Sequence, residues 1–373
     1  MYKKVVEKST TFIFVYKHFY LSYNQVKVVN NMLKKAKVLK KGDTVCTVSS
    51  SWGGAGDVDL RFRYEIGKKR LEEMGLNVIE MPHTLAGSQF VYENPQARAA
   101  DLNAAFANPE IKAIFSCIGG SDSVRMLPYL DWDIIKANPK IYMGYSDSTI
   151  THLICHKAGF TSFYGPSILA EFAENNKMFE YTKHWVEKVL FSPAPLGTIE
   201  PCKEYTDDYV PWTEETQHID KKMKPNKGYE LLQGSGVVQG RLLGGCLDVW
   251  EFVKGTELFP EKESFDGAIL FFETSEDTPS PDFIEFWLRN YATMGVLQKV
   301  NGIIFGKPYQ EKYYEEYKER ILKVLKEIDS TIPVFYNGSF GHNEPMCVIP
   351  YGVMAELDCD NMTFTIIESA AVE

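Results

Sequence analysis

Ser146 lies in a stretch whose residue types could build a nucleophile. Residues 141–143 are an apolar run that predicts a buried strand, Gly144 permits a sharp turn, and a helix is expected from Asp147. A serine at such a strand-to-helix corner lifts its hydroxyl from the sheet, beside the free N–H groups of the helix start. The same residues also suit a helix cap, with Ser146 or Asp147 accepting hydrogen bonds from the first turn. This stretch alone leaves both interpretations open.

A serine nucleophile needs a base, and histidine is the usual one. The sequence contains seven histidines. The helix after Ser146 should carry His152 and His156 away from the serine hydroxyl. His342 instead follows a strand end in a loop, where it could face a cleft, although a loop histidine is often simply exposed.

The base in turn needs an acid that orients it. Glu273 directly follows four apolar residues, 269–272, which predict a buried strand. A carboxylate that ends a buried strand costs free energy unless it is hydrogen-bonded, so Glu273 is the candidate acid. An ordinary solvent-facing residue is the alternative, and we expect this of nearby Glu276 and Asp277.

Gly119 and Gly120 end another predicted strand, over residues 111–118. The N–H groups of Gly120 and Asp147 could together form an oxyanion hole, although a tight turn would also explain the two glycines. The sequence has no G-x-G-x-x-G motif and no P-loop lysine, which argues against a dinucleotide-dependent oxidoreductase.

Strands and helices alternate through the first half of the chain. Helices are expected over 60–74, 94–108 and 178–191, between strands that include 44–48, 77–81 and 160–164. This alternation predicts a parallel α/β sheet covered on both faces. Ligands bind at the carboxyl ends of such strands, so the loops that contain Ser51, Gly119 and Ser146 should lie near one another.

The second half, from about residue 236, mixes strands and helices around its own apolar core. Before it, an acidic and aromatic stretch contains Trp212, which could stack on a planar ligand or pack onto the domain. The predicted division is an N-terminal extension over 1–37, loosely held, an α/β domain over 38–195, a linker and substrate loop over 196–235, and a C-terminal domain over 236–373.

The composition limits the class of protein. The 373 residues carry a net charge of -10, which argues against nucleic acid polymers as partners. Seven scattered cysteines without a Cys-x-x-Cys pair indicate reduced thiols in a cytoplasm rather than disulfides or a zinc site. The apolar run at 11–16 is too short to span a membrane. We therefore expect a cytoplasmic protein without membrane partners.

Several motifs in both halves together resemble the serine LD-carboxypeptidase family. The match runs in order over about residues 38–365 and rests on Ile118-Gly119-Gly120, Leu127 to Asp131, Gly144-Tyr145-Ser146-Asp147, Leu243-Gly244-Gly245, Ile269 to Glu273, Gly302 to Gly306 and Phe340-Gly341-His342.

The resemblance implies a Ser–Glu–His triad of Ser146, Glu273 and His342, with an oxyanion hole formed by the N–H groups of Gly120 and Asp147. It also implies a Rossmann-like N-terminal domain, a smaller β-rich α+β C-terminal domain and an active site in the cleft between them. The family is usually dimeric, so we expect a homodimer. The resemblance also implies that neither a cofactor nor a metal is needed.

The family has two branches, one that releases terminal D-alanine from muropeptides and one of the microcin C immunity type. The arginine usual in the first branch is absent before Ile118-Gly119-Gly120-Ser121, whereas Trp212 fits the stacking tryptophan of the second. The chain therefore looks closer to the microcin immunity branch, with Gly119, Ser121, Trp212 and Cys246 as candidate substrate contacts. Cys246 departs from the asparagine usual at its position.

These observations predict an enzyme, a serine hydrolase that acts through an acyl-enzyme. Its expected substrate is a small aminoacyl- or peptidyl-nucleotide, and the alternative substrate is a muropeptide ending in D-alanine. A non-catalytic protein that binds a small molecule in the cleft is the alternative of another class.

Overall fold

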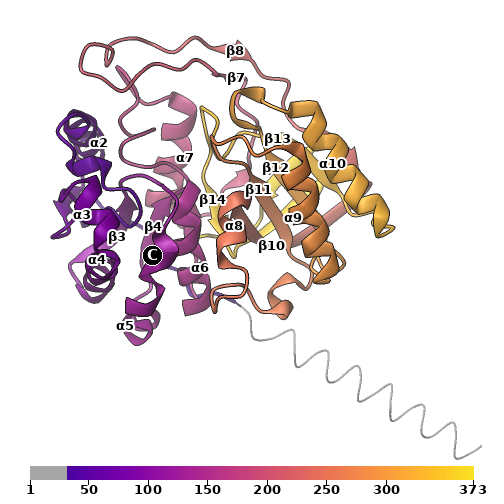
Figure 1. Ribbon diagram of the computed structural model, residues 1–373, viewed down its shortest axis with the longest axis horizontal. Coiled ribbons are helices and arrows are strands. Elements are labelled where there is room, and N and C mark those ends of the chain that lie inside the picture. The colour runs from indigo at the N-terminus through magenta and orange to yellow at the C-terminus, as the bar shows by residue number, and fades with distance from the viewer. Residues whose placement is uncertain (1–31) are drawn as a thin grey trace, which may run out of the picture. The chain divides into compact units, whose positions relative to one another are not determined.

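The computed structural model describes residues 32–373, and a six-stranded sheet organises the first half of this part (Figure 1). Its order is β14-β5-β4-β3-β1-β2. The strands are β1 (Thr44–Val48), β2 (Asn77–Glu80), β3 (Ile111–Ser116), β4 (Ile141–Gly144), β5 (Ser162–Tyr164) and β14 (Ile349–Tyr351). All neighbours pair in parallel except β14, which is antiparallel to β5. The predicted parallel sheet is therefore confirmed.

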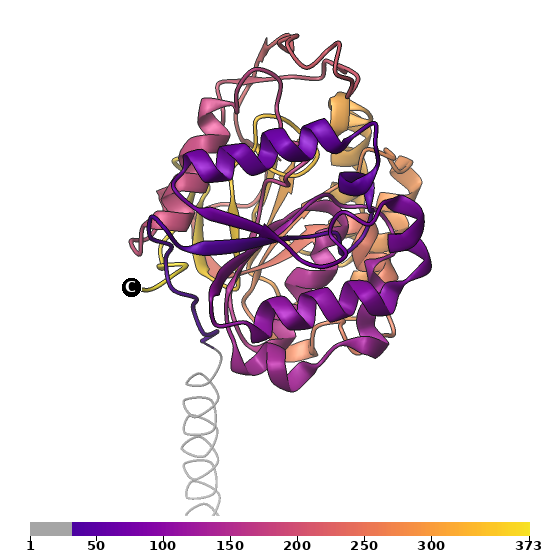
Figure 2. The ribbon, with the colours of Figure 1, turned by 90° about the vertical axis from the view of Figure 1, so that its left-hand side faces the viewer.

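Helices cover both faces of this sheet, with α2 (Arg61–Glu73) on one face and α4 (Pro95–Ala107) on the other (Figure 2). The other helices of this half are α3 (Ser88–Glu93), α5 (Trp132–Ala137), α6 (Thr149–Ala158) and α7 (Glu180–Phe191). The Asn94-Pro95 signal predicted the start of α4, because proline loses no hydrogen bond in the first turn.

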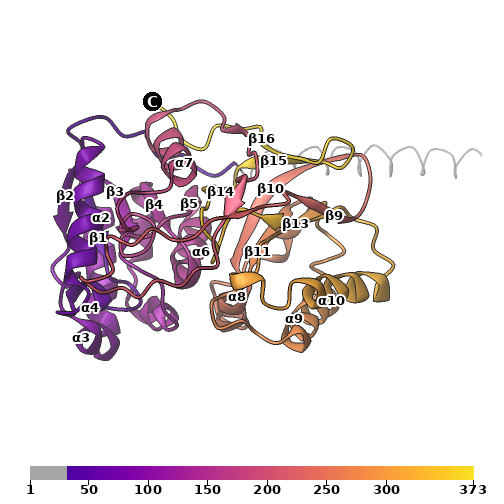
Figure 3. The same ribbon diagram turned by 90° about the horizontal axis from the view of Figure 1, so that it is seen from above.

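An eight-stranded mixed sheet organises the second half, in the order β6-β16-β15-β10-β11-β12-β13-β9. Its strands are β6 (Gly197–Thr198), β9 (Glu230–Gln233), β10 (Val237–Cys246), β11 (Ile269–Glu273), β12 (Gly302–Gly306), β13 (Val334–Gly338), β15 (Met354–Asp358) and β16 (Thr363–Ile366). Its helices are α8 (Leu247–Val253), α9 (Pro281–Thr293) and α10 (Tyr314–Glu327), of which α9 and α10 lie side by side (Figure 3). The strands from β10 to β13 pair in parallel, so their carboxyl ends form a second ligand-facing edge.

The two sheets are tied together, because β14 comes from the second half of the sequence but extends the first sheet. Residues 34–373 form one compact unit, so the domain boundaries at 195 and 235 stay a prediction. Lys34 and Lys37, which fall in the predicted extension, form backbone bridges with Phe160 and Val372. The expectations for residues 1–31 lie outside the described residues.

A long segment between the two halves carries the short strands β7 (Glu204–Tyr205) and β8 (Lys224–Pro225), seen along the top of Figure 1. We call residues 204–225 the strap. Short 3-10 helices complete the structure: Gly54–Gly56, Ser123–Tyr129, Ser146–Ser148, Lys262–Phe265 and Tyr309–Glu311. Within residues 32–373, no helix is both long enough and apolar enough to cross a membrane.

Candidate active site

Ser146 lies at the turn where β4 leads toward α6. The turn is a 3-10 helix, Ser146–Ser148, so α6 begins at Thr149 rather than at the expected Asp147. Ser146 has φ 60°, a left-handed conformation that is uncommon and costly for a residue with a side chain. The Ser146 side chain forms no capping hydrogen bond to the 3-10 helix or to α6, and Ser146 is 8% exposed. The cap interpretation is therefore wrong for Ser146, and the strained corner favours a functional role.

Asp147 does not act as a helix cap either. Its Oδ2 atom accepts hydrogen bonds from Ser51 Oγ at 2.5 Å and from the N–H of Ser123 at 2.8 Å. Burial raises the pKa of this carboxyl above its usual value. The Asp147 side chain therefore joins the loops after β1, β3 and β4, which the sequence predicted to meet at one sheet edge.

The loop with Gly119 and Gly120 passes close to the serine. A methyl group added to Gly119 would lie 2.7 Å from Ser146 Cβ and 2.8 Å from Ser146 Oγ, and one added to Gly120 would lie 2.3 Å from Ser51 Oγ. Gly120 also has φ 147°. Only glycine fits both positions, because real Cβ atoms do not approach other atoms so closely. Within residues 32–373, the N–H groups of Gly120 and Asp147 donate no hydrogen bond, which leaves both available to an oxyanion.

Glu273 and His342 lie together at the carboxyl ends of β11 and β13. The Nδ1 atom of His342 lies 2.7 Å from Glu273 Oε2, and the same oxygen accepts the backbone N–H of His342 at 3.1 Å. Gly341 has φ 82°, and a methyl group there would lie 2.4 Å from Glu273 Cγ. Glu273 is 1% exposed, and these hydrogen bonds compensate the cost of burying its carboxylate.

Tyr164, at the end of β5, connects this pair to the serine. Its hydroxyl donates to Glu273 Oε1 at 2.5 Å and accepts the backbone N–H of Ser146 at 3.0 Å. The link crosses from the first sheet to the second. Sequence analysis missed Tyr164, although its place at a strand end before Gly165 was a usable signal.

Glu276 has a partner that the sequence did not indicate. Its side chain is exposed, as expected, but its Oε2 atom lies 2.8 Å from His342 Nε2. The hydrogen bond from His342 lowers the pKa of Glu276 to about 2. Burial disfavours the charged form of His342, but Glu273 and Glu276 outweigh it and raise the pKa of His342 well above its usual value. Within the described residues, no hydrogen bond joins His342 to Ser146.

Two other histidines lie on α6, and neither lines the cavity that contains Ser146. The ring of His152 bonds Ser162 Oγ at 2.8 Å and the carbonyl of Gly144 at 2.9 Å, and it is fully buried. Burial lowers the pKa of both His152 and His156 to about 4. Both rings are therefore structural and neutral.

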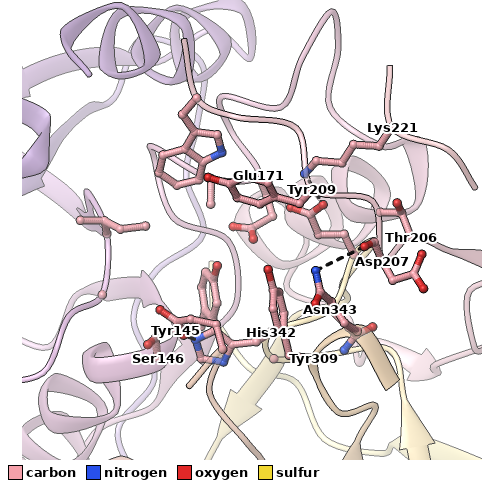
Figure 4. A pocket seen from close by; sticks show the side chains of 18 of the residues that line it. Tyr145, Ser146, Glu171, Thr206, Asp207, Tyr209, Lys221, Tyr309, His342 and Asn343 are labelled. Carbon is pink, nitrogen blue, oxygen red and sulfur yellow. Dashed lines mark hydrogen bonds and ion pairs between the residues drawn. The ribbon is translucent and has the colours of Figure 1, made fainter. Parts of the chain in front are cut away.

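A cavity of about 250 Å³ contains Ser146 and His342 on one side and strap residues on the other (Figure 4). Gly119, Gly120 and Trp212 also line it. The guanidinium of Arg63 lies 4.4 Å from the centre of the Trp212 ring, so Trp212 both packs on the domain and faces the cavity. The strap is also held to the second half, where Thr206 N–H donates to the carbonyl of Glu344 at 2.8 Å.

Two predicted substrate contacts lie outside the cavity lining. Ser121 is exposed, and Cys246 is fully buried behind Glu273. Cys246, Glu273 and His342 bring ligand atoms within 4.8 Å of one another, as a metal site would. However, Glu273 and His342 already bond each other, and burial raises the pKa of the Cys246 thiol well above its usual value, which disfavours the thiolate that metals bind. The proposed site therefore includes neither Cys246 nor Ser121.

Comparison with known proteins places both halves of the chain in one family. Residues 45–165 match the LD-carboxypeptidase N-terminal domain, and residues 239–357 match the LD-carboxypeptidase C-terminal domain. The microcin C7 self-immunity protein MccF of Escherichia coli is 32% identical over 89% of this chain and 95% of its own length. A Vibrio cholerae protein named as a carboxypeptidase is also 32% identical, over 88% of this chain and 96% of its own.

Solved structures give the same result. An MccF-like protein from Streptococcus pneumoniae in complex with AMP superimposes with a TM-score of 0.81, at 33% identity over 87% of this chain and 98% of that one. MccF in complex with aspartyl sulfamoyl adenosine superimposes with a TM-score of 0.79, at 30% identity over 91% and 99% of the two chains. The chain therefore belongs to the LD-carboxypeptidase family of serine hydrolases, with solved relatives of the MccF type.

Proposed function

We propose that this enzyme hydrolyses the acyl linkage between an aminoacyl or peptidyl group and a nucleotide. The observation that carries the proposal is the shared cavity, which holds Ser146 at a strained corner and His342 paired with Glu273. The nucleotide part rests on Trp212 in the lining and on relatives whose structures contain AMP or an aminoacyl sulfamoyl adenosine.

In the proposed reaction, Ser146 Oγ attacks the acyl carbon while His342 Nε2 takes the serine proton. Glu273 holds the imidazole through Nδ1 and stabilises its charged form. The N–H groups of Gly120 and Asp147 receive the oxyanion. The tetrahedral intermediate collapses as His342 returns the proton to the leaving nitrogen. Water, deprotonated by His342, then releases the acyl group from Ser146.

A muropeptide ending in D-alanine is the second candidate substrate, because the family is named for carboxypeptidases. Recognition of a terminal carboxylate calls for a free cation, usually arginine. Among residues 32–373, no arginine lines the cavity, and its one lysine, Lys221, is paired with Glu174 at 2.7 Å and with Glu344. This arrangement favours the nucleotide substrate.

Direct competition between substrates tests the proposal. The purified enzyme is offered alanyl sulfamoyl adenosine and a tetrapeptide ending in D-alanine, and products are separated by chromatography and identified by mass. We expect free alanine and sulfamoyl adenosine, with the tetrapeptide intact. Release of D-alanine alone would contradict the proposal.

Replacing Trp212 by alanine separates the two substrates further. Loss of base stacking, worth about 1–3 kcal/mol, should raise KM for the nucleotide substrate by about 5-fold to 150-fold. Trp212→Phe keeps a ring and should retain most of the affinity. Any residual tetrapeptide hydrolysis should not change, because that substrate has no base to stack. Equal damage to both activities would indicate that Trp212 only supports the strap.

A further inference from the structure

Both ring nitrogens of His342 are engaged by carboxylates. Glu273 Oε2 lies 2.7 Å from Nδ1, and Glu276 Oε2 lies 2.8 Å from Nε2. A base that takes the proton of Ser146 must present a free Nε2 lone pair to the serine hydroxyl. Glu276 pairs with Nε2 and favours a proton on it, so this ion pair must be broken before the serine can be activated.

The two carboxylates differ in how firmly they are held. Glu273 is buried and is bonded by Tyr164 and by two groups of His342. Glu276 belongs to the loop between β11 and α9, its side chain is 60% exposed, and His342 is its one side-chain partner in residues 32–373. Moving Glu276 therefore breaks a single ion pair, whereas moving Glu273 would break its hydrogen bonds to both His342 and Tyr164.

The charges around the cavity indicate what could draw Glu276 away. Five lining residues carry carboxyl groups, namely Glu171, Asp207, Asp208, Glu276 and Glu344, and burial raises the pKa of Glu171 to about 7. Apart from His342, Lys221 is the one cation among the described lining residues, and Glu174 and Glu344 already pair with it. A cationic group on a ligand is therefore attracted to this site, and an additional carboxylate is repelled.

We propose that Glu276 binds an ammonium group of the acyl residue and that this movement frees His342 Nε2 for Ser146. The inference rests on the proposed function and assigns its substrate class. An α-ammonium nitrogen lies about 2.5 Å from the acyl carbon by covalent geometry, so it arrives next to the position of Nε2. A lysine-like side chain on the acyl residue would carry an ammonium group as well, at a different position. Acyl residues with acidic side chains are poor substrates on this account.

Binding to a Ser146→Ala variant tests the inference without turnover. Titration calorimetry compares sulfamoyl adenosines that carry alanyl, N-acetylalanyl, lysyl, Nα-acetyllysyl or aspartyl groups. We expect N-acetylalanyl, which has no ammonium, to bind about tenfold or more weakly than alanyl, as for loss of a charge-assisted hydrogen bond. Aspartyl should also bind more weakly than alanyl. If the Nα-acetyllysyl compound binds as tightly as the alanyl compound, the side chain supplies the ammonium group. If it binds as weakly as the N-acetylalanyl compound, the α-amine supplies it.

The preference is measured as the Kd of the N-acetylalanyl compound divided by the Kd of the alanyl compound. Adding Glu276→Gln to the Ser146→Ala variant should reduce this ratio to near one. Asp277→Asn is the matched control, because Asp277 is an exposed neighbour outside the lining, and it should preserve the preference. Equal binding of ammonium-bearing and ammonium-free compounds, or a preference that survives Glu276→Gln, overturns the inference. Failure of the wild-type enzyme to hydrolyse compounds that it binds would instead contradict the proposed function.

Discussion

At the scale of single residues, Glu273 and Glu276 together favour the charged form of His342. His342 faces Glu273 at the end of β11, Glu276 in the following loop, and the ring of Tyr145 at 5.0 Å. The two carboxylates raise the pKa of His342, and the base works only when neutral, so kcat/KM should increase with pH through this raised value. Glu276→Gln removes one carboxylate, lowers the pKa of His342 and should move the acidic limb of kcat/KM to lower pH.

A pH–rate profile of both enzymes on alanyl sulfamoyl adenosine measures this shift. Asp277→Asn serves as the control and should leave the limb in place. If the acidic limb of kcat/KM lies at the same pH in the wild type and in Glu276→Gln, Glu276 does not change the pKa of His342.

At the scale of elements, Tyr164 couples β5 to β11 through hydrogen bonds to Ser146 and Glu273. Tyr164→Phe keeps the buried ring but leaves the Ser146 N–H and one Glu273 oxygen without their partner. We expect about 1–3 kcal/mol less stability. We also expect about a tenfold to hundredfold loss in kcat, because Ser146 and Glu273 are no longer aligned. KM should change little, because Tyr164→Phe removes no substrate contact. Denaturant titration and steady-state kinetics measure the two effects, and an unchanged kcat would reduce Tyr164 to a packing role.

The loop after β3 makes a second prediction at this scale. Gly119→Ala places a methyl group against Ser146 Cβ and Oγ, so the loop or the serine must shift. We expect activity to fall at least about a hundredfold while the circular dichroism spectrum is retained, since a displacement of about 1 Å is costly to catalysis. Ser121→Ala, in the same loop but exposed, should be nearly neutral. Full activity in Gly119→Ala would contradict the close approach.

At the scale of the whole molecule, the site depends on two sheets that share a strand. Because β14 extends the first sheet from within the second half, neither half closes its fold without the other. We therefore expect one cooperative thermal transition, with equal calorimetric and van't Hoff enthalpies. Two resolved transitions in scanning calorimetry would show that the halves unfold separately. The homodimer stays a prediction.

The sequence predicted the parallel first sheet and the mixed second half because their apolar runs, glycines and Asn94-Pro95 are local signals. It also predicted that Ser146, Glu273 and His342 meet, although only through strand-end positions and the family resemblance. It could not predict the role of Glu276, because a partner distant in sequence decides where an exposed loop carboxylate points. The pairing of β14 with β5 is likewise set by tertiary packing, which a strand pattern does not contain.

Covalent labelling of the serine tests the central claim most directly. The enzyme is treated with a fluorophosphonate, residual hydrolysis of alanyl sulfamoyl adenosine is followed in time, and the modified residue is located by peptide mass mapping. The account predicts one adduct, on Ser146, that forms at the rate at which activity is lost and is strongly reduced in His342→Ala. An adduct on another residue, or normal turnover by Ser146→Ala, would contradict it.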